Sequence, residues 1–329
     1  MENELVWGLP VIGYLFLAGL GAGAMVTSAT LLLIGEHKPA YFRFARYGAI
    51  FSIPAVAIGT LFLIFELGTF QAGYWFKWLN LFTTITMSPM SIGTWMLVIF
   101  FIFAVPYAYT FMVSESHNKD NLAAMRKRLA LPNIILGVAV AVYTGVLLGA
   151  MPARPLWNSP LLALLFLVSA LSTGVASVLL FEWLSVKTGL SDWFAEKRGW
   201  DKNQMDDEHN DAAYKMATSG AVLIALEMLV LSLFFLYAHL AVGNAVRAID
   251  VLEFGGAMST LFWVGVVLLG LAIPIVLEAQ QVMPRFTGNG TYTHSGMMIV
   301  LVPVLVVVGG FILRYVIVVG GQIAKLAGI

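Results

Sequence analysis

The chain has 329 residues, of which 60% are hydrophobic and only 11% are charged, and its formal net charge at pH 7 is zero. Soluble domains carry about 25% charged residues, so this composition excludes a soluble globular enzyme and a disordered chain, and the lack of a basic excess excludes a nucleic-acid binder. The sequence contains no cysteine, which excludes a disulfide, an iron–sulfur cluster held by this chain and a covalently attached haem c.

Apolar segments long enough to cross a membrane recur along the whole chain. A helix needs about 20 apolar residues to span about 30 Å of hydrocarbon, and only helices or closed barrels satisfy their backbone groups there. Barrel strands would alternate in polarity over about 10 residues, a pattern that the sequence lacks. We therefore predict an all-α integral membrane protein with eight transmembrane helices, at residues 9–34, 47–67, 89–112, 131–150, 160–183, 216–242, 257–278 and 296–319.

The distribution of Lys and Arg predicts the orientation of these helices. Of the 18 Lys and Arg residues, 13 lie in the loops after the first, third, fifth and seventh spans, and five lie on the other face. Because positively charged loops stay in the cytoplasm, we expect both termini on the outer face of a bacterial or archaeal cytoplasmic membrane. The second loop contains the aromatic run YWFKW at 74–78, which indicates either an amphipathic segment in the interface or a plain aromatic belt.

The two halves of the sequence share a pattern, which predicts two repeated four-helix bundles at 1–150 and 151–329. Four residues of the third span recur with identical spacing in the seventh: Met90, Ser91, Trp95 and Pro106 match Met258, Ser259, Trp263 and Pro274. The first and fifth spans share runs of small residues, at 19–24 and 172–177, that favour close helix packing. Bundles of four spans share one topology, so an axis along the membrane normal would relate them. Chance similarity among apolar helices is the competing explanation.

Ionisable side chains inside apolar spans are expensive and indicate function by default. Glu227 lies near the middle of the sixth span, where a carboxyl group must be protonated or paired, and we predict that it relays protons. Glu66 lies at the outer end of the second span. Glu182 and Glu278 lie at inner span ends and are interpreted as boundary residues that reach headgroup water. Arg314, in the outer part of the eighth span, is either functional or snorkels outward.

The histidine content argues against a haem b. A bis-histidine haem needs two histidines at matching depth on neighbouring helices, and only His239 of the five histidines lies within an apolar span. We therefore expect no haem, and no metal of this protein's own through which electrons could move.

A family resemblance rests on five segments that cover nearly the whole chain. They are WGLPVIGYLFLAGLGAGA at 7–24, FELGTFQAGYWF at 65–76, SPMSIGTW at 88–95, YTGVLLGAMPARPLWNSPLLALLFLVSALSTGVAS at 143–177 and GGFILRYVIVVGGQ at 309–322. Together they resemble the NrfD/PsrC family, the membrane subunits of polysulfide-reductase-type respiratory complexes. The resemblance implies eight helices in two four-helix bundles, no haem, and a site for menaquinone or ubiquinone near the outer face. It also implies two partners, a ferredoxin-like subunit with four iron–sulfur clusters and a molybdopterin catalytic subunit.

The resemblance and the residue types together predict which side chains serve the quinone. Quinone chemistry couples two electrons to two protons. The ring oxygens therefore need hydrogen-bond partners, the reaction needs a proton acceptor, and the isoprenoid tail needs an apolar slot. Tyr143, in the YTG segment of the family, is the predicted partner, whereas a tyrosine hydroxyl with only a structural role would bond a backbone carbonyl. Glu66, where family members often carry Asp, is the predicted proton acceptor, and Arg154 is a clamp at the mouth. Trp157 and Ser91 complete the predicted quinone-binding residues.

These observations predict a quinone-reactive subunit that exchanges electrons between the membrane quinone pool and an iron–sulfur partner. Glu66 and Glu227 are the residues expected to handle its protons. A secondary transporter or ion channel is the alternative, because eight helices, a parallel repeat and a mid-membrane carboxyl group suit that function too. A structural anchor that has lost its quinone site is the third possibility.

Overall fold

Long helices that run roughly side by side make up the computed structural model of the protein. The structure describes residues 7–35, 38–66, 79–83, 88–113, 119–190, 192–193, 196, 202–241, 244–287 and 297–324. Within them eight helical stretches are long and apolar enough to cross a membrane, which confirms the eight predicted spans. These described residues form helices and no strand, so the all-α prediction is also confirmed.

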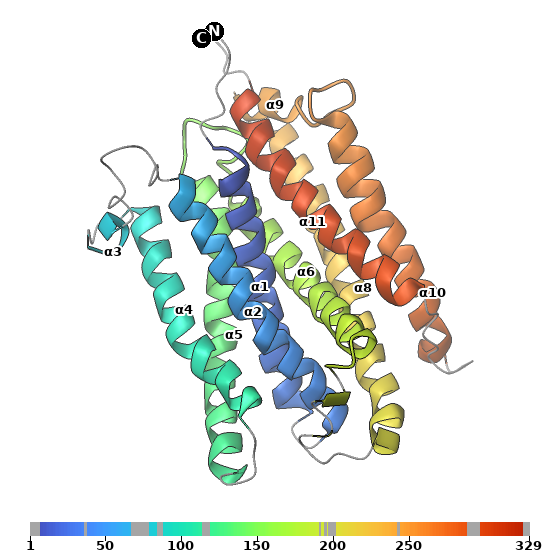
Figure 1. Ribbon diagram of the computed structural model, residues 1–329. Helices are drawn as coiled ribbons and strands as arrows, with labels where there is room; N and C mark the ends of the chain where they lie inside the picture. The colour runs from blue at the N-terminus through green and yellow to red at the C-terminus, as the bar shows by residue number, and fades with distance from the viewer. Residues whose placement is uncertain are drawn as a thin grey trace.

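Within the described residues eight helical stretches form the spans, and two short helices with described bounds lie between them. The spans are α1 (Leu9–Ile34), α2 (Pro39–Glu66), α4 (Pro89–Met112), α5 (Lys119–Gly149), α6 (Pro160–Lys187), α8 (Lys202–Leu240), η2 (Leu261–Ala272) continued by α10 (Ile273–Phe286), and α11 (Met298–Ile323). The short helices are α3 (Asn80–Thr83) and α9 (Asn244–Ile249). α1 begins and α11 ends at one end of the bundle, which we call the terminal end, and the other end is the opposite end (Figure 1).

Several helices continue past the predicted apolar segments, most of them at the opposite end. The largest extensions are the starts of α2 at Pro39, α5 at Lys119 and α8 at Lys202, and the end of α10 at Phe286. Hydropathy falls where charged residues begin. A helix makes its backbone hydrogen bonds internally, however, so it can continue into water. Polar helix ends therefore extend from the bundle where the sequence concentrates its Lys and Arg residues.

α1 and α6 form the centre of the bundle. α1 contacts α2, α5, α6 and α11, and α6 contacts α8 and α11 in addition. Small residues let the two central backbones touch, since a Cβ added to Gly23 would overlap the Ala170 carbonyl group, and one added to Gly174 would overlap Gly23. The predicted role of Gly23 and Gly174 in close helix packing is thereby confirmed.

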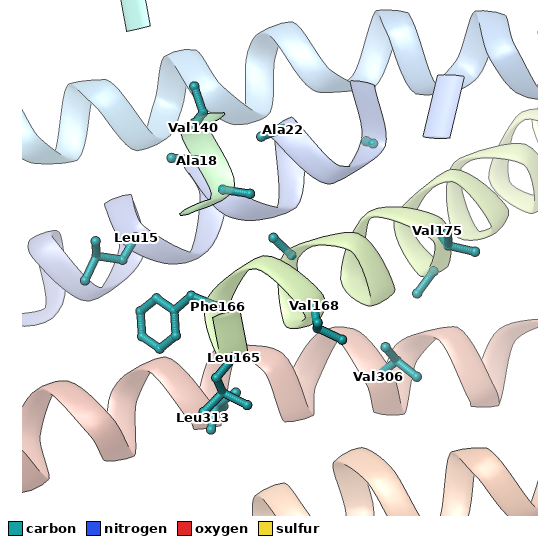
Figure 2. Packing of buried hydrophobic residues seen from close by; sticks show 14 of the residues in the cluster. Leu15, Ala18, Ala22, Val140, Leu165, Phe166, Val168, Val175, Val306 and Leu313 are labelled. Atoms are coloured by element: carbon teal, nitrogen blue, oxygen red, sulfur yellow. The ribbon is translucent and has the colours of Figure 1, made fainter. Parts of the chain in front are cut away.

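Figure 2 shows the part of the buried apolar core where α1, α5, α6 and α11 meet, and further members of the core lie on α2, α4 and α8. Its labelled members are Leu15, Ala18 and Ala22 of α1, Val140 of α5, Leu165, Phe166, Val168 and Val175 of α6, and Val306 and Leu313 of α11. The outward faces of α4 and α8 instead expose large apolar side chains, among them Ile102, Tyr109, Leu229 and Leu236. Such an apolar exterior suits contact with lipid rather than with water.

The seventh span departs from regular α-helix. Its first part, η2, is a π-helix of 12 residues, and α10 continues it from Ile273. π-Helical segments are rare, occur mostly as single turns and are frequent at functional sites. η2 packs closely on α11, because a Cβ added to Gly270 or to Gly309 would overlap the backbone of the other residue.

Candidate functional site

Polar side chains at the terminal end join the first helix to the last. The Trp7 amide donates to Gln322 Oε1 at 2.9 Å, and Gln322 Nε2 donates back to the Trp7 carbonyl oxygen at 3.0 Å. Arg154 Nη1 donates to the Gln322 carbonyl oxygen at 2.8 Å. The Trp157 indole N–H donates to the Ile317 carbonyl oxygen at 2.7 Å. These bonds tie the starts of α1 and α6 to the end of α11.

Two predicted quinone-binding residues, Arg154 and Trp157, belong to this arrangement. The Trp157 ring stacks on Trp7 with their centroids 5.2 Å apart, and it occupies the space that a side chain at Gly321 would need. Because the Trp157 indole N–H already has a partner, this residue forms a wall and offers no donor. The Arg154 guanidinium lies 6.0 Å from the Trp157 ring centroid. A guanidinium carries five N–H donors, and one of them accounts for the bond to Gln322.

Glu66, the last residue of α2, lies beside the start of α1. Its Oε1 accepts a hydrogen bond from the Gly8 amide at 3.3 Å, and its side chain is half-buried. Gly8 follows the Trp7 that contacts Trp157, so the structure brings Glu66, Arg154 and Trp157 to the same end of the bundle. Residues 67–78, which include the predicted interfacial aromatic run, lie outside the described part of the sequence.

Tyr143 of α5 lies against a glycine of α4. Its phenol ring occupies the space that a side chain at Gly93 would take, so the ring packs on bare backbone. Tyr143 is 6% exposed, and its hydroxyl makes no hydrogen bond to any residue that the structure describes. A bond from this hydroxyl to a backbone carbonyl, the structural alternative, is therefore absent from the described residues.

A second phenol, Tyr14 of α1, accompanies Tyr143. Tyr14 is 1% exposed and close enough to Tyr143 for the two groups to interact electrostatically. Its hydroxyl also lacks a hydrogen-bond partner within the described ranges. A tyrosine hydroxyl can donate one hydrogen bond and accept others, so two neighbouring hydroxyls without a bond to the described residues are available to a ligand oxygen.

Ser91 lies in the first turn of α4, where the Ser88 hydroxyl accepts a hydrogen bond from its amide at 3.3 Å. It is buried and precedes Gly93 by two residues. Residues two apart are separated by about 200° around an α-helix. Ser91 therefore lies in the same turn as the glycine that contacts Tyr143, but on another face.

Sequence reasoning missed Trp7, Tyr14 and Gln322. All three lie in the segments at 7–24 and 309–322 that support the family resemblance. Trp7 and Gln322 are 315 positions apart, and no spacing in the sequence shows that the two helices meet. The polar character of Gln322 near the end of an apolar span was the available signal.

A second polar group lies deeper, where α6, α8 and α11 meet. Arg314 is fully buried and donates from Nη1 to Ser169 Oγ at 2.5 Å and from Nη2 to the Phe166 carbonyl oxygen at 3.3 Å. Glu227 is 3% exposed, and its Oε2 accepts a hydrogen bond from Ser172 Oγ at 2.9 Å. Ser169 forms a hydrogen bond with Glu227 as well, so it connects the two ionisable side chains.

Arg314 points into the bundle and does not snorkel. Its guanidinium lies 5.0 Å from the Phe166 ring centroid and within 3.4 Å of the position that a Cβ on Gly19 would take. Gly19 follows Tyr14 on α1 by five residues, about 7.5 Å at roughly 1.5 Å per residue. The group around Arg314 and Glu227 therefore lies directly below the level of the two phenols.

Glu182 and Glu278 are buried, although the sequence indicated that they reach headgroup water. Glu182 Oε1 accepts a hydrogen bond from Arg43 Nη2 at 2.5 Å, which forms an ion pair between α6 and α2. Glu278 is 7% exposed and faces α8 at Gly220, and its Oε2 has no hydrogen-bond partner among the described residues. Both carboxyl groups are internal because a neighbouring helix covers each of them, α2 at Arg43 and α8 at Gly220.

An apolar exterior, eight spans, a polar cluster at one end and a buried polar group around Arg314 and Glu227 define a multi-pass helical membrane protein. The chain belongs to the family described as "Polysulphide reductase, NrfD", whose model matches residues 1–326. This match confirms the resemblance inferred from the sequence.

Individual relatives are similar over most of their length. The C subunit of polysulfide reductase from Wolinella succinogenes is 28% identical, over 97% of this sequence and 95% of that protein. Protein NrfD of Escherichia coli (strain K12) is 28% identical, over 84% of this sequence and 85% of that protein. A homolog of NrfD from Haemophilus influenzae is 26% identical, over 97% and 95%.

Proposed function

We propose that this protein is the quinone-reactive membrane subunit of a respiratory oxidoreductase. It exchanges electrons between the membrane quinone pool and a four-cluster iron–sulfur subunit, which serves a molybdopterin catalytic subunit. Membership of the polysulphide reductase family supports this class of complex, and the similarity to one named component of polysulfide reductase supports a subunit role within such a complex. The observation that carries the quinone site is the pair of phenols, Tyr14 and Tyr143, that lack partners among the described residues.

The chemistry of the two phenols matches the substrate. One quinone takes up two electrons and two protons to give one quinol, and the reverse reaction releases them. A quinone ring oxygen that accepts a hydrogen bond from one of these hydroxyls gains about 0.5–1.5 kcal/mol net. Tyr143 is the proposed donor to one ring oxygen. Because Gly93 has no side chain, the hydroxyl end of the Tyr143 ring can approach α4 closely, in the space that a Cβ would take.

The polar residues at the terminal end have complementary roles in this proposal. Glu66 exchanges protons between the quinone oxygens and water, since it is half-buried beside the start of α1. Arg154 holds the mouth through its remaining N–H donors, and Trp157 provides an apolar wall together with its stacked partner. Ser91 lies on another face of the same turn of α4, so this proposal gives it no contact with the quinone that Tyr143 holds.

Glu227 is proposed to connect this site with the far side of the membrane. Its carboxyl group can hold and release a proton, and the hydroxyls of Ser169 and Ser172 can pass it on. Arg314 lies between Glu227 and α1, which it approaches at Gly19. Gly19 is five residues from Tyr14 along α1, about 7.5 Å at roughly 1.5 Å per residue. Glu278 lies between α10 and α8, nearer the opposite end of the bundle, and is a second carboxyl group in the half that contains Glu227.

We further propose that 1–150 and 151–329 are two four-helix bundles of common origin. The neighbour relations support this proposal, because corresponding helix pairs pack together in both halves. The first and second spans pair as α1 with α2 and α6 with α8, the first and fourth as α1 with α5 and α6 with α11, and the third and fourth as α4 with α5 and η2 with α11. The central contact between α1 and α6 joins the first helices of the two halves.

Identification of bound quinone in the intact complex tests the proposed function. The complex is purified from membranes in mild detergent, and an organic extract is analysed by mass spectrometry. We expect menaquinone or ubiquinone in near-equal amount to the protein, and a strong loss of it in the Tyr14→Phe/Tyr143→Phe double variant. A protein that purifies without an iron–sulfur partner and without quinone, but carries a solute across vesicles, supports the transporter alternative and contradicts the proposal.

A further inference from the structure

An apolar groove lies at the opposite end of the bundle, away from the proposed quinone site. Its volume is about 410 Å³, and residues of α1, α2, α6 and α8 line it. Ligand pockets in proteins commonly measure about 300–1,000 Å³. The apolar part of the lining comes from Val26, Leu31, Ile34, Val175 and Leu223.

The groove is elongated and open to the surroundings. Two antiparallel stretches border it, from Val26 to Ile34 on α1 and from Leu223 back to Lys215 on α8. Each stretch rises by eight residues, about 12 Å at roughly 1.5 Å per residue. Ile34 is 63% exposed, and Ser219 on the α8 border is exposed as well, so an elongated molecule can enter from the side.

A cluster of cations lies at the mouth of the groove. Asp211 gathers them: Arg285 Nη2 lies 2.8 Å from Asp211 Oδ1, and Lys215 Nζ and Lys38 Nζ lie 3.7 Å and 4.0 Å from Oδ2. Three positive charges against one carboxylate leave an excess of two among these side chains. The Lys38 and Lys215 side chains are each 50% exposed, so both can reach a further anion.

Aromatic rings complete the mouth. The Tyr41 hydroxyl donates to Asp211 Oδ2 at 2.8 Å, and its ring lies 5.1 Å from Lys215 Nζ. Tyr214 lies beneath the Arg285 guanidinium, with 4.3 Å between ring centroid and Cζ. Tyrosines with an apolar body and a polar tip are enriched at the depth of lipid headgroups. The mouth therefore has the charge and the side chains of a headgroup site, and the groove below it has those of an acyl-chain site.

We propose that this groove binds one anionic phospholipid. Its phosphate lies between Lys38 and Lys215, and one acyl chain follows the groove between α1 and α8. The excess of positive charge selects a headgroup with net negative charge over a zwitterionic one, and it gives no advantage to a neutral isoprenoid quinone. Under the orientation predicted from the loop charges, this lipid belongs to the inner leaflet, where anionic headgroups attract Lys and Arg. The proposal does not depend on the quinone function.

A competition experiment on the full-length protein tests the choice of headgroup. The purified protein is stripped of lipid and mixed with equal amounts of phosphatidylglycerol and phosphatidylcholine of identical acyl chains, and native mass spectrometry counts the retained molecules. We expect one tightly retained phosphatidylglycerol. In the Lys38→Gln/Lys215→Gln double variant we expect its preference to fall at least about fivefold, since one lysine near an anionic lipid contributes about that factor. Lys187→Gln, which removes an exposed cation outside the groove, should leave the preference unchanged.

A steric variant tests the path of the acyl chain. Ser219→Phe places a ring in the groove from its exposed border and should reduce retention of the lipid, whereas Val222→Phe, on the exposed face of α8 outside the groove lining, should not. Equal retention of the two lipids by the unmodified protein overturns the proposal without any variant. Retention of a quinone in place of a phospholipid, or an equal loss in the Lys187→Gln control, overturns it too.

Discussion

Replacing Tyr143 by Phe removes a single hydroxyl that has no hydrogen-bond partner in the described part of the protein. Phe keeps the ring that packs on Gly93. The folded protein therefore loses no internal hydrogen bond, and the free energy of unfolding should change by less than about 0.5 kcal/mol. The quinol loses one hydrogen bond of about 0.5–1.5 kcal/mol. A change of about 1.4 kcal/mol is tenfold, so kcat/KM for quinol should fall by roughly 2- to 13-fold.

A matched control has the opposite expectation. The Tyr107 hydroxyl is fully buried and lies 3.2 Å from Ser28 Oγ, in the half of the bundle nearer the opposite end. Tyr107→Phe breaks this hydrogen bond, so the free energy of unfolding should fall by about 0.5–1.5 kcal/mol. The activity with quinol should be unchanged, because Tyr107 lies far from the terminal end.

The assay compares two electron routes in the intact complex. A water-soluble quinol analogue must react at the membrane subunit, whereas an artificial dye exchanges electrons with the partner subunits directly. Tyr143→Phe should lower turnover with the quinol analogue alone. An equal fall with both donors means that Tyr143 acts on assembly, and unchanged quinol turnover means that its hydroxyl does not contact the substrate. Either result refutes the reasoning.

Three further outcomes follow from the geometry. Glu227→Gln keeps the hydrogen bond from Ser172, but the amide cannot carry a proton. In proteoliposomes this variant should therefore slow quinone turnover or abolish the membrane potential. Full turnover with full potential would eliminate the proton relay. Gly23→Ala forces a methyl group onto the carbonyl of α6 and should destabilise the fold by about 1–3 kcal/mol in a detergent unfolding assay, whereas Gly320→Ala meets only contacts of 3.5 Å or more and should have little effect. The protein should show no haem α-band in reduced-minus-oxidised spectra, since both ring nitrogens of His239 already contact protein oxygens; an α-band that scales with this subunit would overturn that expectation.

The eight spans were predictable because hydrocarbon thickness alone sets the length of an apolar helix. The first residues of α5 and α8, Lys119 and Lys202, were not predictable. Where a helix leaves the membrane its side chains become polar, but its backbone hydrogen bonds continue unchanged. The close packing at Gly23 was also predictable, since small residues in apolar helices have few other uses. Which helix each small residue would meet depends on tertiary structure.

The candidate site was predictable only in part. Tyr143, Glu66 and Arg154 could be proposed from the family segments, but the Tyr14 phenol beside Tyr143 depends on how α1 packs against its neighbours. Arg314 shows the same limit, because its depth in the span is compatible with snorkelling. Its burial follows from Ser169, a residue 145 positions away that accepts its hydrogen bond.

The π-helix η2 has a consequence for the symmetry of the two halves. Trp95 and Pro106 are separated by the same number of residues as Trp263 and Pro274, yet the first pair lies on an α-helix and the second is joined by a π-helix. Each residue of a π-helix turns the backbone through a smaller angle, because its hydrogen bonds reach five residues on instead of four. The angle around the helix axis from Trp263 to Pro274 therefore differs from the angle from Trp95 to Pro106. Residues with equal spacing in the two halves then lie on different sides of their helices. Sites that depend on a shared helix face cannot be copied from one half to the other across this span.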